Sequence, residues 1–265
     1  MRSLTVKGRY YQTSPPGRFK GEVEETFQVD FDRSALLVVD VYGHGFPQWD
    51  GVRRHPSSDK EHDRPYQEVT VRYIRPAQEA ARLAGMPVVY AHNSGPNIKI
   101  NRSQLGKQLE RTLQCDVEEL FHERGVDPRE YLCREDNLFL ETAPVVAPQP
   151  GDYFIRKHFY SGFKDTRLDT LLRNLDIKTL FCVGFDASVC LLCTMIDAFE
   201  LNYEVVLLRD ACRAYDITED VEIGYSFTAR IVKWVEAWLG RSIETQHFMD
   251  LMASIEPRAA EVRIG

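Results

Sequence analysis

Thr179-Leu-Phe-Cys-Val-Gly184, followed by Phe185-Asp-Ala-Ser-Val-Cys190-Leu-Leu-Cys-Thr-Met-Ile-Asp-Ala198, is the stretch that decides the fold of this chain. The short apolar run that ends at Gly184 predicts a strand buried in a parallel sheet. Ser188 precedes an apolar segment of helical spacing and is predicted to cap that helix at its N-terminus. Cys190 then falls in the first helical turn, where unpaired N–H groups and the helix dipole favour a thiolate. Cys190 is therefore either a candidate nucleophile or a small buried residue.

Apolar strands alternate with helical segments on both sides of this stretch. Strands are predicted at 34–42, 86–92, 152–157 and 204–208, and helices at about 67–84, 168–175 and 218–239. Such alternation predicts an α/β fold, a doubly wound and mainly parallel sheet with helices on both faces. Ligands of such sheets bind beyond the carboxyl ends of the strands. The residues at or just after such ends are Asp40, His92, Lys157 and Cys190.

The chain of 265 residues is predicted to form one main domain, residues 34–265, preceded by an N-terminal arm. Residues 1–33 are polar and aromatic, are broken at Pro15-Pro16-Gly17, and show no core strand. They are expected to pack on the surface or on a neighbouring subunit. Residues from about 95 to 150 lose the regular pattern, with short helical pieces at 104–113 and 116–123, and are interpreted as an insertion over the sheet edge or the site.

Composition excludes several classes of protein. The hydrophobic fraction of 43% and charged fraction of 28% are typical of a globular protein, and no apolar run is long enough to span a membrane. A net charge of −7 without a basic stripe argues against nucleic acid as a partner. The six irregularly spaced cysteines and the absence of a secretory h-region predict reduced thiols and a cytoplasmic location.

Asp40, Lys157 and Cys190 form a chemically coherent set of carboxylate, ammonium and thiol. In this order they resemble the triad of the isochorismatase-like cysteine hydrolase superfamily, and the resemblance extends from about residue 34 to residue 253. The motifs that carry it are Leu-Leu-Val-Val-Asp40 with Phe46, Lys157 with Tyr160-Ser-Gly-Phe163, Val183-Gly184 through Val189-Cys190, and Asp210-Ala-Cys. The resemblance implies an isochorismatase-like three-layer sandwich.

The resemblance also implies roles for these residues. Lys157 would stabilise the thiolate of Cys190, while Asp40 takes the thiol proton and later delivers it to the leaving amine. Neutral Lys157 with protonated Asp40 is an alternative resting state, because the groups titrate as a coupled set. A cis peptide bond is implied between Phe185 and Asp186, which would turn the N–H groups of Asp186 and Cys190 toward one point as an oxyanion hole.

Departures from the family pattern bear on the substrate. Cys190 favours C–N hydrolysis, because members that cleave the vinyl ether of isochorismate lack the thiol. Nicotinamidase-type members bind a metal through an Asp-x-His motif and further histidines. That motif is not found in this chain, because the histidines lack the required spacing; they are His44, His55, His62 and His92. Neither a metal nor a cofactor is therefore expected. Asp186, if it faces or buttresses the pocket rather than the surface, favours a neutral substrate rich in N–H donors.

The Tyr160-Ser-Gly-Phe163 segment is similar to the branch that hydrolyses ureides: ureidoacrylate, N-carbamoylsarcosine, biuret and triuret. The predicted function is hydrolysis of a C–N bond in a small ureido or amide compound, with biuret or triuret favoured, through a thioester-type intermediate on Cys190. Alternatives are a ureidoacrylate or N-carbamoyl amino acid amidohydrolase, a nicotinamidase-type carboxamidase, and a catalytically silent binding or scaffold protein.

Aromatic and polar residues that flank the triad are candidates for substrate binding, with core packing as the alternative for Phe46 and Tyr160. They are Tyr42, His44, Phe46, Asn93 and Tyr160. The resemblance further implies a homo-oligomer, a dimer or a tetramer. The N-terminal arm and the helix that carries Trp234 and Trp238 are candidate contacts, although that helix could instead line a buried face.

Overall fold

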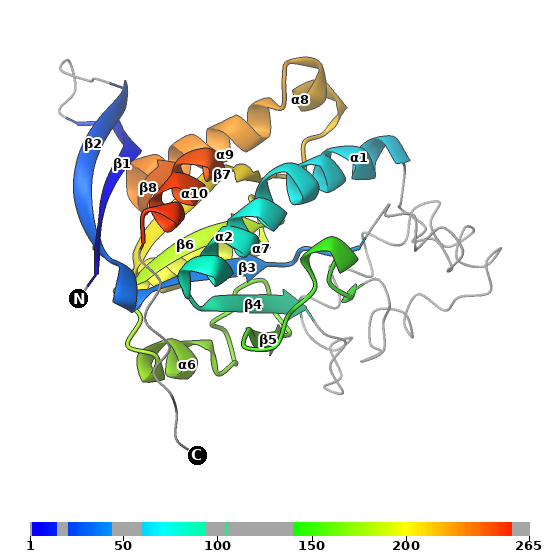
Figure 1. The fold of residues 1–265 in the computed structure, drawn as a ribbon. Coiled ribbons are helices and arrows are strands. Elements are labelled where there is room, and N and C mark those ends of the chain that lie inside the picture. The colour runs from blue at the N-terminus through cyan, green and yellow to red at the C-terminus, as the bar shows by residue number, and fades with distance from the viewer. Residues whose placement is uncertain (1, 15–20, 44–59, 94–103, 105–139, 256–265) are drawn as a thin grey trace.

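A computed structural model describes residues 2–14, 21–43, 60–93, 104 and 140–255 of the chain. Its core is one sheet with the strand order β2-β1-β8-β7-β6-β3-β4-β5 (Figure 1). The six strands from β8 to β5 pair in parallel, as the alternation of strands and helices predicts. Their bounds are β3 Ser34–Val39, β4 Val88–Asn93, β5 Tyr153–Lys157, β6 Thr179–Gly184, β7 Glu204–Cys212 and β8 Gly240–Ile243.

Helices cover both faces of the sheet, which makes a three-layer α/β sandwich (Figure 1). On one face, α2 (Arg75–Ala84) and α10 (Thr245–Ala253) pack against alternate strand residues such as Leu36 and Phe181. On the other, α6 (Leu168–Asn174), α7 (Cys190–Glu200) and α9 (Ser226–Trp238) pack against the intervening residues such as Leu37 and Cys182. Because successive strand side chains point to opposite faces, strands buried on both faces are continuously apolar.

The N-terminal segment contains two strands of the sheet, so the expectation of no core strand there was wrong. β1 (Ser3–Gln12) and β2 (Gly21–Asp30) form an antiparallel hairpin that extends the sheet beyond β8. Leu4, Val6 and Val29 are buried against the main core. The period-2 alternation of Leu4 and Val6 with polar residues carries this signal, but it is short and is diluted by charged and aromatic residues.

Two further expectations about helices are corrected, and one alternative is decided. The expected helix over 218–239 is two helices, α8 (Thr218–Glu222) and α9, because Gly224 and Tyr225 adopt positive φ angles of 78° and 60° between them. The expected helix over 67–84 begins earlier, as α1 (Lys60–Val69), and continues through a π-helical turn (Thr70–Ile74) into α2. Trp234 and Trp238 of α9 are exposed, and the buried face of that helix is formed by Val232, Val235 and Glu236.

Short 3-10 helices at Phe31–Arg33 and Pro144–Val146 complete the described elements. The helical pieces expected at 104–113 and 116–123 lie outside the described residues, apart from residue 104. No helix in the described ranges combines the length and the apolar character that crossing a membrane requires.

Candidate active site

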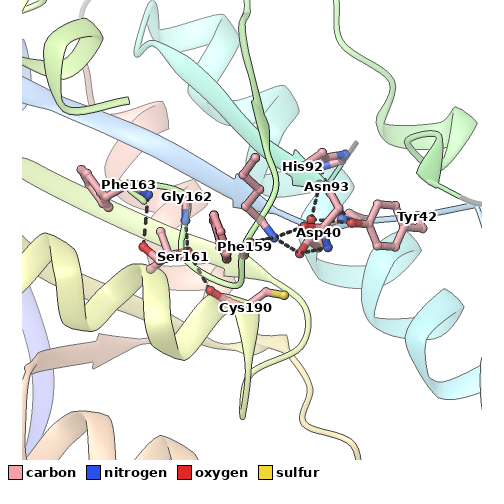
Figure 2. A network of polar contacts seen from close by, with 12 residues as sticks. Asp40, Tyr42, His92, Asn93, Phe159, Ser161, Gly162, Phe163 and Cys190 are labelled. Carbon is pink, nitrogen blue, oxygen red and sulfur yellow. Dashed lines mark hydrogen bonds and ion pairs between the residues drawn. The ribbon is translucent and has the colours of Figure 1, made fainter. Parts of the chain in front are cut away.

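The carboxyl ends of four neighbouring parallel strands bring the candidate residues together. Asp40 directly follows β3, Asn93 ends β4, Lys157 ends β5, and Cys190 begins the helix that follows β6. Close packing of β3 against β6 depends on Gly184, whose φ is 118° and where a Cβ atom would stand 2.0 Å from the Val39 carbonyl oxygen. Figure 2 shows the side chains of Asp40, Asn93 and Cys190 converging at this edge of the sheet.

Lys157 and Asp40 form an ion pair that is almost completely buried. Lys157 Nζ lies 2.6 Å from Asp40 Oδ2, and it also donates to Asn93 Oδ1 at 2.7 Å and to the Phe159 carbonyl oxygen at 3.2 Å. These three acceptors satisfy the three N–H bonds of an ammonium group. The ammonium is thus held in a fixed position although it lies away from bulk water.

Asp40 accepts hydrogen bonds at both carboxylate oxygens. Oδ1 accepts from the Tyr42 hydroxyl at 2.5 Å and from the Asn93 backbone N–H at 2.9 Å. Oδ2 accepts from Asn93 Nδ2 at 3.2 Å in addition to Lys157. The Asn93 side-chain amide therefore bridges both members of the pair, with its oxygen on Lys157 and its nitrogen on Asp40. Asn93 and Tyr42 were predicted to bind substrate, but the polar groups of both are engaged with the triad.

Cys190 is the first residue of α7, as the sequence predicts, and its side chain is directed toward Asp40 (Figure 2). Burial raises the pKa of its thiol, the Asp40 carboxylate raises that pKa further, and Lys157 opposes the rise. The residue is 8% exposed. Burial and the Asp40 charge thus favour the thiol, against the thiolate-stabilising effects of Lys157 and of the first helical turn.

The loop between β6 and α7 contains a cis peptide bond, between Phe185 and Asp186. The Asp186 carbonyl oxygen accepts the N–H groups of Val189 and Leu191, and the Arg213 carbonyl oxygen accepts that of Ala187. Within the described ranges, by contrast, no acceptor is bonded to the N–H groups of Asp186 and Cys190. The predicted cap is different: Val189, not Ser188, precedes the helix, and no side chain caps it.

The Asp186 carboxylate buttresses this loop. Its Oδ1 accepts from the backbone N–H and the hydroxyl of Ser188, at 2.8 and 2.5 Å. The Tyr66 hydroxyl of α1 lies 3.4 Å from Asp186 Oδ2 and 3.3 Å from the Ala214 carbonyl oxygen, and it can donate to either. Burial raises the pKa of Asp186, and these hydrogen bonds oppose the rise. Sequence reasoning missed Tyr66, because no motif connects a helix residue so distant in the chain with the loop.

His92 supports the backbone that carries Asp40 and Tyr42. Its Nε2 accepts the Val41 N–H at 3.3 Å, and its Nδ1 lies 3.1 Å from Thr142 Oγ1. Because Nε2 is an acceptor, the ring is neutral with its proton on Nδ1. Burial lowers the pKa of His92 to about 4; the Asp40 carboxylate opposes the lowering, and Lys157 adds to it. Thr142 also pairs with Tyr42 through an isolated antiparallel bridge.

Tyr160 lies beside the nucleophile. Burial raises the pKa of its hydroxyl, and the nearby Cys190 and Cys193 raise that pKa further. It also lines a cavity of about 360 Å³ on the same side of α7, together with Phe159, Ser161, Lys164, Cys193, Asp197 and Gln104. Gly162, two residues on, donates its N–H to Thr194 Oγ1 at 2.9 Å, and Thr194 donates to the Cys190 carbonyl oxygen at 2.7 Å. This connection fixes the segment after Lys157 against the helix of Cys190 (Figure 2).

Two predicted substrate-binding residues, His44 and Phe46, lie outside the described residues, as does His55. In the part of the chain that the structure describes, no three His, Cys, Asp or Glu side chains gather as a possible metal site. The cysteines described there, Cys182, Cys190, Cys193 and Cys212, are free thiols.

Comparisons with known proteins agree with this fold. The family model named Isochorismatase domain matches residues 34–235. Ureidoacrylate amidohydrolase RutB of Acinetobacter baylyi is 28% identical over 217 residues, which cover 78% of this chain and 82% of that protein. Ureidoacrylate amidohydrolase RutB of Pantoea ananatis is 29% identical over 178 residues, which cover 67% of each chain.

Solved structures show the same fold. A cysteine hydrolase from Pseudomonas syringae superimposes with a TM-score of 0.62 at 22% identity, covering 86% of this chain and 96% of the other. N-carbamoylsarcosine amidase from Thermoplasma acidophilum superimposes with a TM-score of 0.52 at 22% identity, covering 80% and 96%. The match of the family model over most of the chain identifies this protein as a hydrolase of the isochorismatase family.

Proposed function

We propose that this protein hydrolyses a C–N bond of a small ureido or amide compound, with Cys190 as nucleophile. The observation that carries the proposal is the placement of the Cys190 thiol beside the buried Asp40–Lys157 ion pair, at the carboxyl edge of the sheet. A thiol that attacks a carbonyl carbon must lose its proton, and Asp40 is the adjacent base. The relatives named as ureidoacrylate amidohydrolases support the same chemistry.

The reaction proceeds in two balanced halves. Asp40 takes the Cys190 proton as the sulfur bonds to the substrate carbonyl carbon, and Lys157 stabilises the negative charge at the sulfur and at Asp40. The C–N bond then breaks, Asp40 returns the proton to the leaving nitrogen, and a thioester-type acyl or carbamoyl group remains on Cys190. Water attacks this group, gives a proton to Asp40, and releases the acid product with the thiol restored.

The N–H groups of Asp186 and Cys190 are the proposed oxyanion hole. They are the two N–H groups of the loop that stay without an acceptor while the neighbouring ones are bonded, among the residues that the structure describes. Donors of this kind contribute on the order of 3 kcal/mol each to transition-state stabilisation. A carbonyl oxygen that becomes negative beside Cys190 would be within their reach.

The contacts of Asp186 bear on the expected substrate. The Asp186 carboxylate buttresses the loop through Ser188 and Tyr66. Buttressing is one of the two arrangements expected to favour neutral compounds such as biuret or triuret, but no contact of Asp186 is specific for them. Ureido acids of the ureidoacrylate kind come first instead, on the strength of the two relatives.

A screen for ammonia release tests the proposal. Wild-type protein is incubated with ureidoacrylate, N-carbamoyl amino acids, biuret, triuret and nicotinamide. We expect the fastest release from a ureido acid, complete loss of release in Cys190→Ala, and retention in Cys193→Ala, which removes the free thiol one helical turn away. Release that persists in Cys190→Ala would refute the nucleophile. Turnover of nicotinamide alone would favour a carboxamidase, and no turnover at all would favour the silent binding protein.

A further inference from the structure

Tyr42 has an unusual place in the site, because its hydroxyl contacts the base rather than the cavity. It donates to Asp40 Oδ1 at 2.5 Å and accepts from the Asn93 backbone N–H at 3.2 Å. Its backbone is fixed by the bridge to Thr142 and by the bond between the Val41 N–H and His92. Burial and the charge of Asp40 raise the pKa of Tyr42 well above its usual value, so it is a neutral phenol.

Tyr42 differs from the other side chains that donate to Asp40. Lys157 also carries the charge of the ion pair, and Asn93 also holds Lys157. The proton that Asp40 takes as a base comes from Cys190, which is itself a hydrogen-bond partner of Asp40. Removal of the Tyr42 hydroxyl therefore destabilises the carboxylate and leaves the ion pair and the path of the proton in place.

We propose that Tyr42 is a positioning residue for proton transfer, whose hydroxyl donates to Asp40 and holds its carboxylate ionised and oriented until it takes the Cys190 proton. The proton then moves from Cys190 Sγ to an Asp40 oxygen as the S–H bond breaks and an O–H bond forms, and no proton leaves Tyr42. Tyr42 thus sets how readily Asp40 accepts the proton, while Asn93 and Lys157 keep their bonds to Asp40.

This inference rests on the proposed role of Asp40 as base, and it can be tested without a substrate. Below the titration of the thiol, Cys190 reacts with iodoacetamide only in the form whose proton has moved to Asp40. Protonation of Asp40 from solvent removes this form, so the acid limb of the alkylation rate reports Asp40. The rate is measured against pH by mass spectrometry of the peptide that contains Cys190.

Two changes at position 42 shift this limb in opposite directions. Tyr42→Phe removes the donor, which destabilises the carboxylate, and we expect the limb to move up by about one pH unit. Tyr42→3-fluorotyrosine, nearly isosteric and a stronger donor, should move the limb to lower pH and keeps the test decisive if the Phe variant does not fold. A limb that stays in place in either folded variant would overturn the proposal.

Tyr203→Phe is the matched control. The Tyr203 hydroxyl also donates to a carboxylate, Asp169 Oδ1 at 2.8 Å, but the pair joins α6 to the start of β7. We expect its acid limb to coincide with that of the wild type. A shift of equal size in this control would show that the limb responds to general loosening of the fold, and it would also overturn the proposal. If the ammonia screen finds no turnover while the acid limb of Tyr42→Phe moves to higher pH as expected, the result would count against the proposed function alone.

Discussion

Lys157 Nζ lies 2.6 Å from Asp40 Oδ2, and the two side chains are 0% and 3% exposed. Burial of two charges costs several kcal/mol per ion, and their attraction offsets this only where further hydrogen bonds complete the coordination of both groups. Asn93 supplies such bonds to both, and the Phe159 carbonyl oxygen completes the ammonium. The pair is thus maintained in one geometry beside the thiol.

Loss of one member of this pair should be costly for stability. Lys157→Met leaves the buried Asp40 without its cation, and we expect the free energy of unfolding in urea to fall by about 3–5 kcal/mol. Glu79→Gln is the control, because its ion pair with Arg75 is about half exposed and little change is expected. Equal unfolding midpoints for Lys157→Met and the wild type would show that Asp40 does not require the cation.

Asp40→Asn should separate the reactivity of the thiol from catalysis. The Asp40 charge raises the pKa of Cys190, so its removal should lower that pKa and move the alkaline limb of the alkylation rate, where the thiol itself titrates, to lower pH. Hydrolysis should nevertheless be lost, because no base remains to return the proton to the leaving nitrogen. Asp169→Asn, which removes a carboxylate of an ion pair with Arg173 that is partly exposed, should change neither the alkaline limb nor hydrolysis. An alkaline limb at the wild-type pH or above it in Asp40→Asn would contradict the assigned charge effect.

His92 should make the fold sensitive to acid. Its pKa is lowered to about 4 in the folded state, whereas an unfolded histidine has a pKa near 6.5. The stability that follows from this difference is present above pH 6.5 and is lost as the pH falls toward 4, by about 3 kcal/mol. His92→Gln should lose less stability than the wild type over this interval in urea unfolding. His247→Gln, at a more exposed histidine, should keep the wild-type loss; equal pH slopes in all three proteins would refute the assignment.

The sequence predicts three of the four strands at this edge because each is a short apolar run. Such runs at 34–39, 88–93 and 179–184 are typical of strands buried in a parallel sheet, and parallel strands place their carboxyl ends at one edge. The fourth strand, β5, alternates half-buried and exposed residues before the buried Lys157. The partners of the triad residues could not be predicted in the same way. Asn93 and Tyr42 were expected to face the substrate, since sequence position gives proximity to a site but not the direction of a side chain.

The N-terminal hairpin shows a second limit of sequence reasoning. β2 alternates half-buried and exposed residues, most of them polar, and its place in the sheet depends on β1 rather than on an apolar face of its own. The hairpin contacts the main domain through Arg9 of β1, whose Nε lies 2.8 Å from Glu236 Oε1 on α9. This contact joins residues 227 positions apart, and no local pattern reports it.

The contact between Arg9 and Glu236 should make the hairpin necessary for a stable fold. The Glu236 side chain is 0% exposed, and Ser242 also donates to its Oε1 at 2.5 Å, while Oε2 has no partner among the described residues. Arg9→Leu leaves this carboxylate buried without a cation, so the free energy of unfolding should fall by about 3 kcal/mol.

A double variant distinguishes charge from packing at this contact. Arg9→Leu combined with Glu236→Leu removes both charges and should recover most of the loss, because the unpaired buried carboxylate is then absent. Lys7→Leu is the control on the same strand, since its ion pair with Glu24 is largely exposed and the expected change is small. If the double variant were as unstable as Arg9→Leu, the contribution of Arg9 would lie in the packing of its side chain. The ion pair with Glu236 would then not be the interaction that stabilises the contact between the hairpin and the domain.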